Sequence, residues 1–477
     1  MTTRPSGFGR FLSFLTTIVW LSFFLVGTAL QGQDRPRKDL PTLKKELAEA
    51  ETSKGKDHAD LIPILDEISN SYREQGGYVP ALPFTQRALE IARKVHAREQ
   101  DSVDVAIQLD YQGTLYHLQG DDKSAMESYG QALPIVEKKL GADHPAYASL
   151  LTNVAIACLA SGNTGEAERS LQKALGVVNT AFGAAAQEAT DVQGALGELY
   201  LRTGHFAKAE QYLVYAYTVR SEGLDIPLAA GQTTEPEVLF YMAPVRNLLG
   251  RLYTVVGLYD KADPLLHDAL KAYEAKLGKD HPQLEDVLVN LAALSQAMGH
   301  LDQAEAYQKR VDQIYDKNKG LSFTAASPRP KAIEASLPVA NAVSLYPDAH
   351  VGDWVVYEGP GGIPVSKLEL IRKTTLIAVV RNYSWDPGKK EWQAGIEQIA
   401  DLSGGVKDVY GISESDLKTE KTTIHQSEVP CSTATAAMEG RQCKIYLAPK
   451  TVPVGGLLKV ECDGQVDMQA SDYGRGK

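Results

Sequence analysis

The stretch Val287–Ala304 (VLVNLAALSQAMGHLDQA) holds the pattern that decides the fold of this chain. An apolar helical run ends near Ala297, Gly299 interrupts it, and a second helical run begins around Asp302. Gly299 follows Gly257 by 42 residues, and the same interval separates glycines further upstream. A repeat of that length predicts a solenoid in which each unit is one pair of helices.

Six copies of this unit share one register when they are aligned on their turn glycines. Those glycines are Gly76, Gly120, Gly162, Gly204, Gly257 and Gly299. Alanine stands five residues after every one of them, and Ser, Gly or Ala stands seven residues before. Glycine tolerates the left-handed backbone of a tight turn, and small side chains let two helix axes approach closely. The register therefore predicts six antiparallel helix pairs over residues 61–317.

The motifs of the units resemble tetratricopeptide repeats of the 42-residue kind found in kinesin light chain. Asn290-Leu291-Ala292 matches the start of that repeat, Gly257-Leu258-Tyr259 its turn, and Leu277–Pro282 (LGKDHP) its connection to the next unit. The resemblance implies an all-α superhelical solenoid that binds a protein or peptide partner in its concave groove. It also implies that Asn153 and Asn290 bond the backbone of an extended peptide; the alternative is that they are ordinary helix asparagines.

A different pattern begins after the repeats. Residues 318–343 are rich in Ala, Ser and Pro, which predicts an extended linker. In residues 344–477, short runs of β-branched and aromatic residues alternate with Gly and Pro turns. That alternation predicts a small, mostly β domain, either a barrel or a sandwich. The chain is therefore expected to be multi-domain, with a helical solenoid followed by a β domain.

The first 29 residues have the composition of a signal peptide. Arg4 and Arg10 form a basic region before the apolar run Phe11–Val26, and Ala29 supplies the small residue that precedes a cleavage site. We therefore expect an exported protein, periplasmic or secreted, whose mature chain opens with a helix and a loop over residues 30–60. The alternative is an uncleaved membrane anchor, because residues 11–30 are long enough to span a bilayer.

Export would allow disulfide bonds to persist. Three of the four cysteines, Cys431, Cys443 and Cys462, fall in the expected β domain, and Cys158 lies inside a helical repeat. We predict a Cys431–Cys443 disulfide, because the residues between the two include Gly440 and could form a hairpin-like excursion. The alternative is that these thiols are unpaired.

No sequence motif indicates an enzyme: the phosphate-binding loop, the zinc-binding H-E-x-x-H, C-x-x-C and G-x-S-x-G are all absent. The two Asp-His-Pro motifs, at residues 143–145 and 280–282, are typical of helix starts, with the aspartate as cap and the proline in the first turn. We therefore expect no catalytic residue, cofactor or metal. An enzymatic alternative would need convergent polar residues in the β domain, such as Asp353, His425 and Glu461.

The charge balance bears on the class of partner. The chain has 49 Lys and Arg against 60 Asp and Glu, a net charge of −11, which argues against nucleic-acid binding. The sequence is thus interpreted as an exported scaffold that binds a protein or peptide. The alternatives are a ligand-binding or enzymatic β domain and a membrane-anchored envelope assembly factor. The repeats specify neither the identity of the partner nor the oligomeric state.

Overall fold

A computed structural model describes most of the chain beyond its N-terminal segment. It covers residues 38–323 apart from 97–100, 184–185, 187 and 224–235. It also covers residues 350–474 apart from 352, 360–363, 374–376, 402–416, 425–426, 439–440, 449–451, 453–456 and 464. The expected signal peptide and most of the expected linker lie outside these residues.

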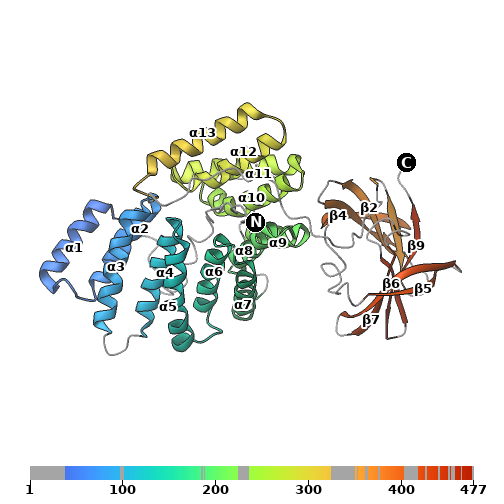
Figure 1. Ribbon diagram of the computed structural model, residues 1–477, viewed down its shortest axis with the longest axis horizontal. Coiled ribbons are helices and arrows are strands. Elements are labelled where there is room, and N and C mark those ends of the chain that lie inside the picture. The colour runs from blue at the N-terminus through green and yellow to red at the C-terminus, as the bar shows by residue number, and fades with distance from the viewer. Residues whose placement is uncertain are drawn as a thin grey trace, which may run out of the picture. The chain divides into compact units, whose positions relative to one another are not determined.

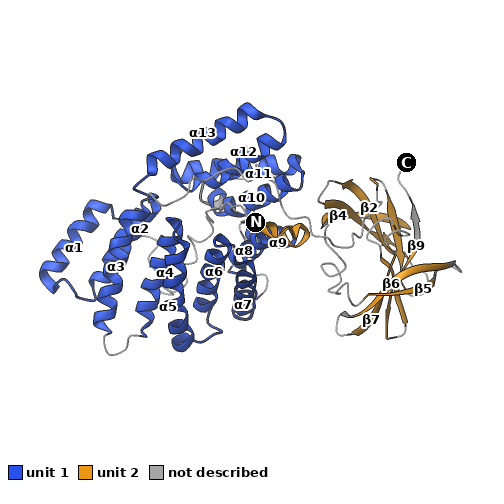
Figure 2. Ribbon diagram, in the orientation of Figure 1, with its two compact units in different colours: residues 1–199, 211–335 blue, residues 200–210, 336–477 orange. Residues whose placement is uncertain are grey.

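The chain divides into a helical unit and a strand unit, which are described separately (Figure 1). Figure 2 colours the two compact units, residues 1–199 with 211–335, and residues 200–210 with 336–477. The first contains nearly all of the helical region, and the second contains every described strand.

One helix, α1 (Leu40–Lys54), precedes six helix pairs in the described residues. The pairs are α2 (Leu61–Glu74) with α3 (Tyr78–Val95), α4 (Val103–Leu118) with α5 (Asp122–Leu140), α6 (Pro145–Ala160) with α7 (Thr164–Phe182), α8 (Ala189–Arg202) with α9 (Phe206–Gly223), α10 (Pro236–Val255) with α11 (Tyr259–Leu277), and α12 (Leu284–Ala297) with α13 (Leu301–Asn318). The predicted helical solenoid is confirmed.

The turn between the two helices of each pair is built as the glycine register predicted. All six turn glycines have φ between 77° and 81°, the left-handed region. The residue after each glycine donates its N–H to the carbonyl of the residue four positions before the glycine. Examples are Asp121 to Tyr116 at 2.9 Å and Asn163 to Cys158 at 2.8 Å. This bond satisfies a carbonyl at the end of the first helix, which otherwise has no partner within the helix.

The small residues seven positions before the turns mark where paired helices cross. A Cβ added at Gly113 would lie 2.5 Å from the ring of Tyr129, and one at Gly250 would lie 2.5 Å from the side chain of Leu266. No side chain fits at such distances, so the second helix can approach only because these positions lack a Cβ. The alanines five residues after the turn are fully buried in the first five pairs.

The two ends of the solenoid are covered differently. At the N-terminal end, α1 buries Leu43 and Leu47 against a cluster that includes Leu61 and Leu65 of α2. Each buried leucine stabilises the fold by about 2 kcal/mol relative to an exposed one. At the other end, α13 packs Val311 and Ile314 inward and leaves most of its polar side chains at least partly exposed. A terminal repeat with a polar outer face is what a solenoid requires for solubility.

The strand unit is one nine-stranded antiparallel sheet in the order β4-β3-β2-β1-β9-β8-β7-β6-β5. The strands are β1 (Trp354–Glu358), β2 (Pro364–Lys373), β3 (Ile377–Asp386), β4 (Glu391–Asp401), β5 (Lys418–Ile424), β6 (Ser427–Met438), β7 (Arg441–Leu447), β8 (Leu457–Cys462) and β9 (Gln465–Gly474). A mostly β domain is confirmed. In the described residues its strands belong to a single sheet rather than to the two sheets of a sandwich.

One face of the sheet forms the core of this unit. Val355, Leu370, Ile445 and Leu458, from four different strands, are fully buried in one cluster. They alternate along their strands with side chains on the other face, as a pleated strand requires. Because strands from both halves of the sheet share this cluster, the sheet must curl around it.

The disulfide differs from the predicted Cys431–Cys443 pair: Cys443 is bonded to Cys462, and Cys431 is a buried free thiol. Cys443 on β7 lies directly opposite Cys462 on β8, with their Cα atoms 4.0 Å apart. Cys431 on β6 lies opposite Glu420 of β5 instead. The register of the sheet, which the sequence does not reveal, decides the pairing.

Candidate functional site

The two candidate peptide-binding asparagines lie on first helices of repeats and are buried. Asn153 on α6 is 1% exposed, and Asn290 on α12 is 6% exposed. Asn153 Nδ2 donates to Asp110 Oδ1 at 2.7 Å, and Asn290 Nδ2 donates to Asn247 Oδ1 at 2.9 Å. Each asparagine therefore binds the first helix of the preceding repeat, and their role toward a peptide stays a prediction.

These two bonds belong to a series that we call the first-helix ladder. Its members are side-chain hydrogen bonds between first helices of successive repeats. The four described rungs are Gln108 to Asp66 at 3.0 Å, Asn153 to Asp110 at 2.7 Å, Arg251 to Glu198 at 3.4 Å, and Asn290 to Asn247 at 2.9 Å. The ladder thus links α2 to α4, α4 to α6, α8 to α10 and α10 to α12.

Sequence reasoning found the asparagines but missed their partners. Asp66, Asp110 and Asn247 all stand ten residues before their turn glycines, while Asn153 and Asn290 stand nine before theirs. A polar residue at a fixed offset within an otherwise apolar helix face was the available signal. This signal does not reveal the partner of each polar residue, because each rung joins residues 42, 43 or 53 positions apart.

The carboxylates of the ladder carry the electrostatic cost of burial. Burial raises the pKa of Asp66 to about 7, although the hydrogen bond from Gln108 acts in the opposite direction. Burial also raises the pKa of Asp110 to about 6, opposed by the bond from Asn153. In both cases desolvation of the charged form outweighs the hydrogen bond. The hydrogen bonds from Gln108 and Asn153 therefore offset only part of the cost of burying these acids in the charged form.

Two members of the ladder, and Gln193 on the first helix α8, have unused hydrogen-bonding capacity. In the described residues, Gln108 Oε1, Asn153 Oδ1 and Gln193 Oε1 are buried and accept no hydrogen bond. An amide oxygen can accept from a main-chain N–H, and leaving it unpaired costs about 1–3 kcal/mol. These atoms on α4, α6 and α8 are acceptors that a bound backbone could satisfy.

The first Asp-His-Pro motif starts α6, with Pro145 as its first residue, whereas the second ends at Pro282, two residues before α12 begins at Leu284. In neither motif is the aspartate the cap, so that prediction is wrong. Nδ1 of His144 accepts from the N–H of Ala146 at 3.1 Å, and Nδ1 of His281 accepts from the N–H of Gln283 at 3.2 Å. His144 is the residue that immediately precedes Pro145 at the start of α6, so its Nδ1 lies where it can accept from the N–H two residues later. Asp280 instead pairs with Lys317 at 2.5 Å.

The residues of the enzymatic alternative have separate partners. Asp353 is fully buried and accepts from the N–H of His350 at 2.9 Å. Glu461 on β8 binds the hydroxyl of Tyr446 at 3.1 Å and the ammonium of Lys459 at 3.0 Å. His425 lies outside the described residues. Among the residues that are described, no three His, Cys, Asp or Glu side chains are grouped to hold a metal ion.

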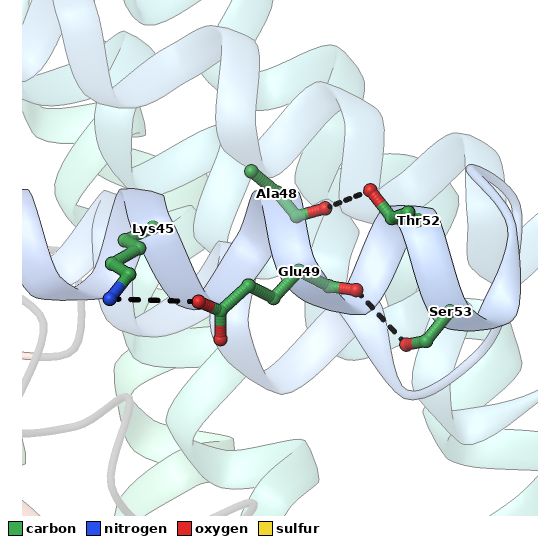
Figure 3. A pocket seen from close by; sticks show the side chains of 5 residues that line it. All are labelled: Lys45, Ala48, Glu49, Thr52 and Ser53. Atoms are coloured by element: carbon green, nitrogen blue, oxygen red, sulfur yellow. Dashed lines mark hydrogen bonds and ion pairs between the residues drawn. The ribbon is translucent and has the colours of Figure 1, made fainter.

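A shallow depression on α1 does not offer a further site (Figure 3). It is lined by one face of a single helix, through Lys45, Ala48, Glu49, Thr52 and Ser53. Lys45 pairs with Glu49 at 3.7 Å, and the hydroxyls of Thr52 and Ser53 bond to carbonyls of their own helix. These polar groups satisfy one another and do not converge on a ligand.

The family comparison identifies the helix pairs. Residues 104–180 and 241–317 match the model of the tetratricopeptide repeat. These stretches hold the helix pairs α4–α7 and α10–α13. Residues 104–180 and 241–317 are therefore tetratricopeptide repeats, and the resemblance seen in the sequence is confirmed for them.

The relatives belong to the kinesin light chain type. The chain is 25% identical over 273 residues to Protein KINESIN LIGHT CHAIN-RELATED 3 of Arabidopsis thaliana, which spans 57% of this chain and 40% of that protein. It is 23% identical over 258 residues to Protein KINESIN LIGHT CHAIN-RELATED 1 of the same plant, spanning 54% and 40%. The chain thus spans about two fifths of the length of these relatives.

Solved structures with similar helical regions are more distant in sequence. BtubC (BKLC) from P. vanneervenii is 19% identical with a TM-score of 0.35, over 64% of this chain and 97% of that one. The apo form of RapI is 16% identical with a TM-score of 0.46, over 63% and 98%. Among the described residues, no helix combines the length and apolarity needed to cross a membrane, and residues 11–30 are not among them.

Proposed function

We propose that this chain is a scaffold whose tetratricopeptide repeats bind a peptide or protein partner along their first helices. The observation that carries the proposal is the first-helix ladder, which places buried polar side chains on first helices from α2 to α12. Repeats of this type are interaction modules, and polar groups inside an apolar surface fix the orientation of a ligand.

The chemistry of the ladder favours the backbone of an extended segment. Amide oxygens of Gln108, Asn153 and Gln193 can accept from main-chain N–H groups at successive positions. The surrounding helix faces are apolar, as α6 shows with a buried run from Ala146 to Leu159. A net charge of −11 disfavours nucleic acid as the partner.

The test compares partner capture by two matched double variants. Asn153→Ala with Asn290→Ala alters first helices of the third and sixth repeats, while Gln172→Ala with Gln313→Ala alters exposed amides on second helices of the same repeats. Partners are crosslinked to the intact chain in its native cell fraction, identified, and then titrated against each variant. We expect at least tenfold weaker binding for the asparagine variant alone. Equal affinity for both variants would contradict the peptide-groove proposal.

We further propose that the scaffold is exported. The basic and apolar pattern of residues 1–29 supports this, and so does the Cys443–Cys462 disulfide, because disulfides persist in oxidising compartments. Sequencing the N-terminus of the native protein tests the proposal. A mature start near Leu30 is expected, whereas an intact N-terminus in the membrane fraction would favour the uncleaved anchor.

A further inference from the structure

The first and last repeats of the helical unit are in direct contact at a place that we call the seam. The seam consists of the α2–α3 turn, the start of α12, and residues 319–323 that follow α13. The N–H of Val79 donates to the carbonyl of Leu321 at 2.8 Å, and the hydroxyl of Ser322 donates to the carbonyl of Gly76. In Figure 1 the end of α13 accordingly leads back to α2.

The seam is closely packed. Phe323 is 1% exposed and stacks on Tyr315, with ring centroids 5.0 Å apart. A Cβ added at Gly76 would lie 2.6 Å from Cδ of Pro282. Close packing of this kind does not tolerate small displacements, so the seam is either formed or parted.

Two titratable side chains are buried where the start of α12 meets the α2–α3 turn. Glu285 is 1% exposed, and neither of its carboxyl oxygens has a hydrogen-bond partner in the described residues. His281 is 7% exposed and lies beside Gly76 and the backbone of Glu74. A charge on either side chain would be deeply desolvated.

The charged and titratable neighbours of these two side chains come from all four helices that meet there. They are Arg73 and Glu74 on α2, Tyr78 on α3, Asp286 on α12 and Asp312 on α13. Burial, together with the carboxylates of Asp286 and Asp312, raises the pKa of Glu285 to about 9. Burial lowers the pKa of His281 to about 4, although the backbone of Glu74 acts in the opposite direction. The closed seam therefore holds both side chains uncharged.

We propose that the seam is a reversible gate of the solenoid, held shut by uncharged Glu285 and His281 and opened when either becomes charged. Gln108 and Asn153 are each 1% exposed in the closed form. Parting the first repeat from the last is a route by which a partner gains access to the ladder. That last step rests on the proposed partner binding, whereas the gate itself needs no partner.

The signs of the two titrations fix the pH dependence of the gate. The pKa of Glu285 rises from 4.5 in the open form to about 9, so the closed form is lost as pH rises through that interval. The pKa of His281 falls from 6.5 to about 4, so the closed form is gained as pH rises between those values. The two effects offset each other between about pH 4.5 and 6.5, and above pH 6.5 only Glu285 acts.

Hydrogen–deuterium exchange of the full chain, without partner, tests the gate. The amide of Val79 reports the seam, and the amide of Ala125, bonded to Asp121 at 3.0 Å, is the internal control. After correction for intrinsic exchange, we expect the protection of Val79 to fall by up to about tenfold per pH unit from pH 6.5 to 9. In Glu285→Gln it should stay level, and in His281→Asn the fall should begin near pH 4.5.

The outcomes separate the gate from its alternatives. A Val79 protection that is level in the wild type, or equally steep in Glu285→Gln, would overturn the proposal. So would a parallel loss at Ala125, because that indicates general unfolding. Should Glu285→Gln fail to fold, the wild type and His281→Asn still test the proposal. The protection of Val79 must then begin to fall near pH 6.5 in the wild type and near pH 4.5 in His281→Asn. Phe323→Ala removes the ring that anchors residues 319–323, and it should expose Val79 at every pH.

Discussion

Asn153 and Asp110 lie 43 residues apart on neighbouring first helices and are joined by a 2.7 Å hydrogen bond that is buried from solvent. The corresponding rung six helices later joins Asn290 to Asn247, two neutral amides, at 2.9 Å. The same position therefore accommodates either an acid or an amide as acceptor. The acid is the costlier choice, because its charged form must be desolvated.

Asp110→Asn is expected to stabilise the helical unit at neutral pH. The pKa of Asp110 is raised by burial to about 6, above its ordinary 3.8, so its ionisation opposes folding increasingly from about pH 4 to pH 6. An amide keeps the acceptor for Asn153 and removes that cost, which is about 1.4 kcal/mol per pKa unit. Urea unfolding followed by far-ultraviolet circular dichroism should show a gain of roughly 1–3 kcal/mol at pH 7.5 and little change at pH 4.

The control for this experiment is Asp143→Asn, which alters an exposed aspartate between the second and third helix pairs. It should leave the free energy of unfolding within about 0.5 kcal/mol of the wild type at both pH values. A loss of stability in Asp110→Asn at pH 7.5 would mean that the carboxylate is stabilising in place, contrary to the desolvation argument.

Gly113 and Gly130, one helix apart, are expected to respond to alanine in opposite directions. A Cβ at Gly113 would lie 2.5–2.9 Å from three ring atoms of Tyr129, which is itself fully buried and has no room to withdraw. Gly113→Ala should therefore cost roughly 1–3 kcal/mol. Gly130 sits on the exposed side of α5 with nothing within 4 Å, so Gly130→Ala should stabilise by about 0.5–1 kcal/mol. Thermal unfolding distinguishes the two directly.

A comparison of alanine substitutions at Gly76 and Gly162 isolates the contribution of the seam to stability. Both are turn glycines with left-handed backbones, at φ 77° and 80°, so alanine carries the same conformational cost of about 1 kcal/mol at either position. Nothing lies within 4 Å of a Cβ at Gly162, whereas one at Gly76 meets the ring of Pro282. Gly76→Ala should therefore be the more destabilising by roughly 1–3 kcal/mol. Equal unfolding midpoints would mean that the seam adapts without cost.

The repeats were predictable because their signals are local and periodic. A left-handed turn favours glycine, and a close helix crossing requires a small side chain or none. Both kinds of residue therefore recur at fixed offsets in every unit. Six turn glycines and the small residues seven positions before them therefore predicted the six helix pairs. The ladder asparagines Asn153 and Asn290 were predicted only through the family resemblance, because their partners lie 43 positions away in the sequence.

The remaining features depend on contacts between distant residues. The seam joins Gly76 to Ser322 across 246 positions, and no repeat pattern specifies that the last unit returns to the first. Strand β5 (KTEKTTI) lacks an apolar face, and β6 contains Pro430, so neither had the alternation that predicts a strand. Sheet register then decides which cysteines meet, and register follows from the pairing of all nine strands.

The pairing of Cys443 with Cys462 is expected to stabilise the strand unit selectively. The two residues are separated by 19 positions, and closing a loop of that size restricts the unfolded chain by about 3 kcal/mol in the chain-entropy model. Cys443→Ser with Cys462→Ser should lower the stability of the strand unit by up to that amount. Cys431→Ser should change it by less than about 1 kcal/mol, because that thiol makes only a weak 3.7 Å contact with the carbonyl of Glu420.

Tryptophan fluorescence is the appropriate readout for these variants, since every tryptophan after Trp20 lies in the strand unit. A digest without reductant should contain the Cys443–Cys462 crosslink, and recovery of a Cys431–Cys443 crosslink from native protein would contradict the observed register.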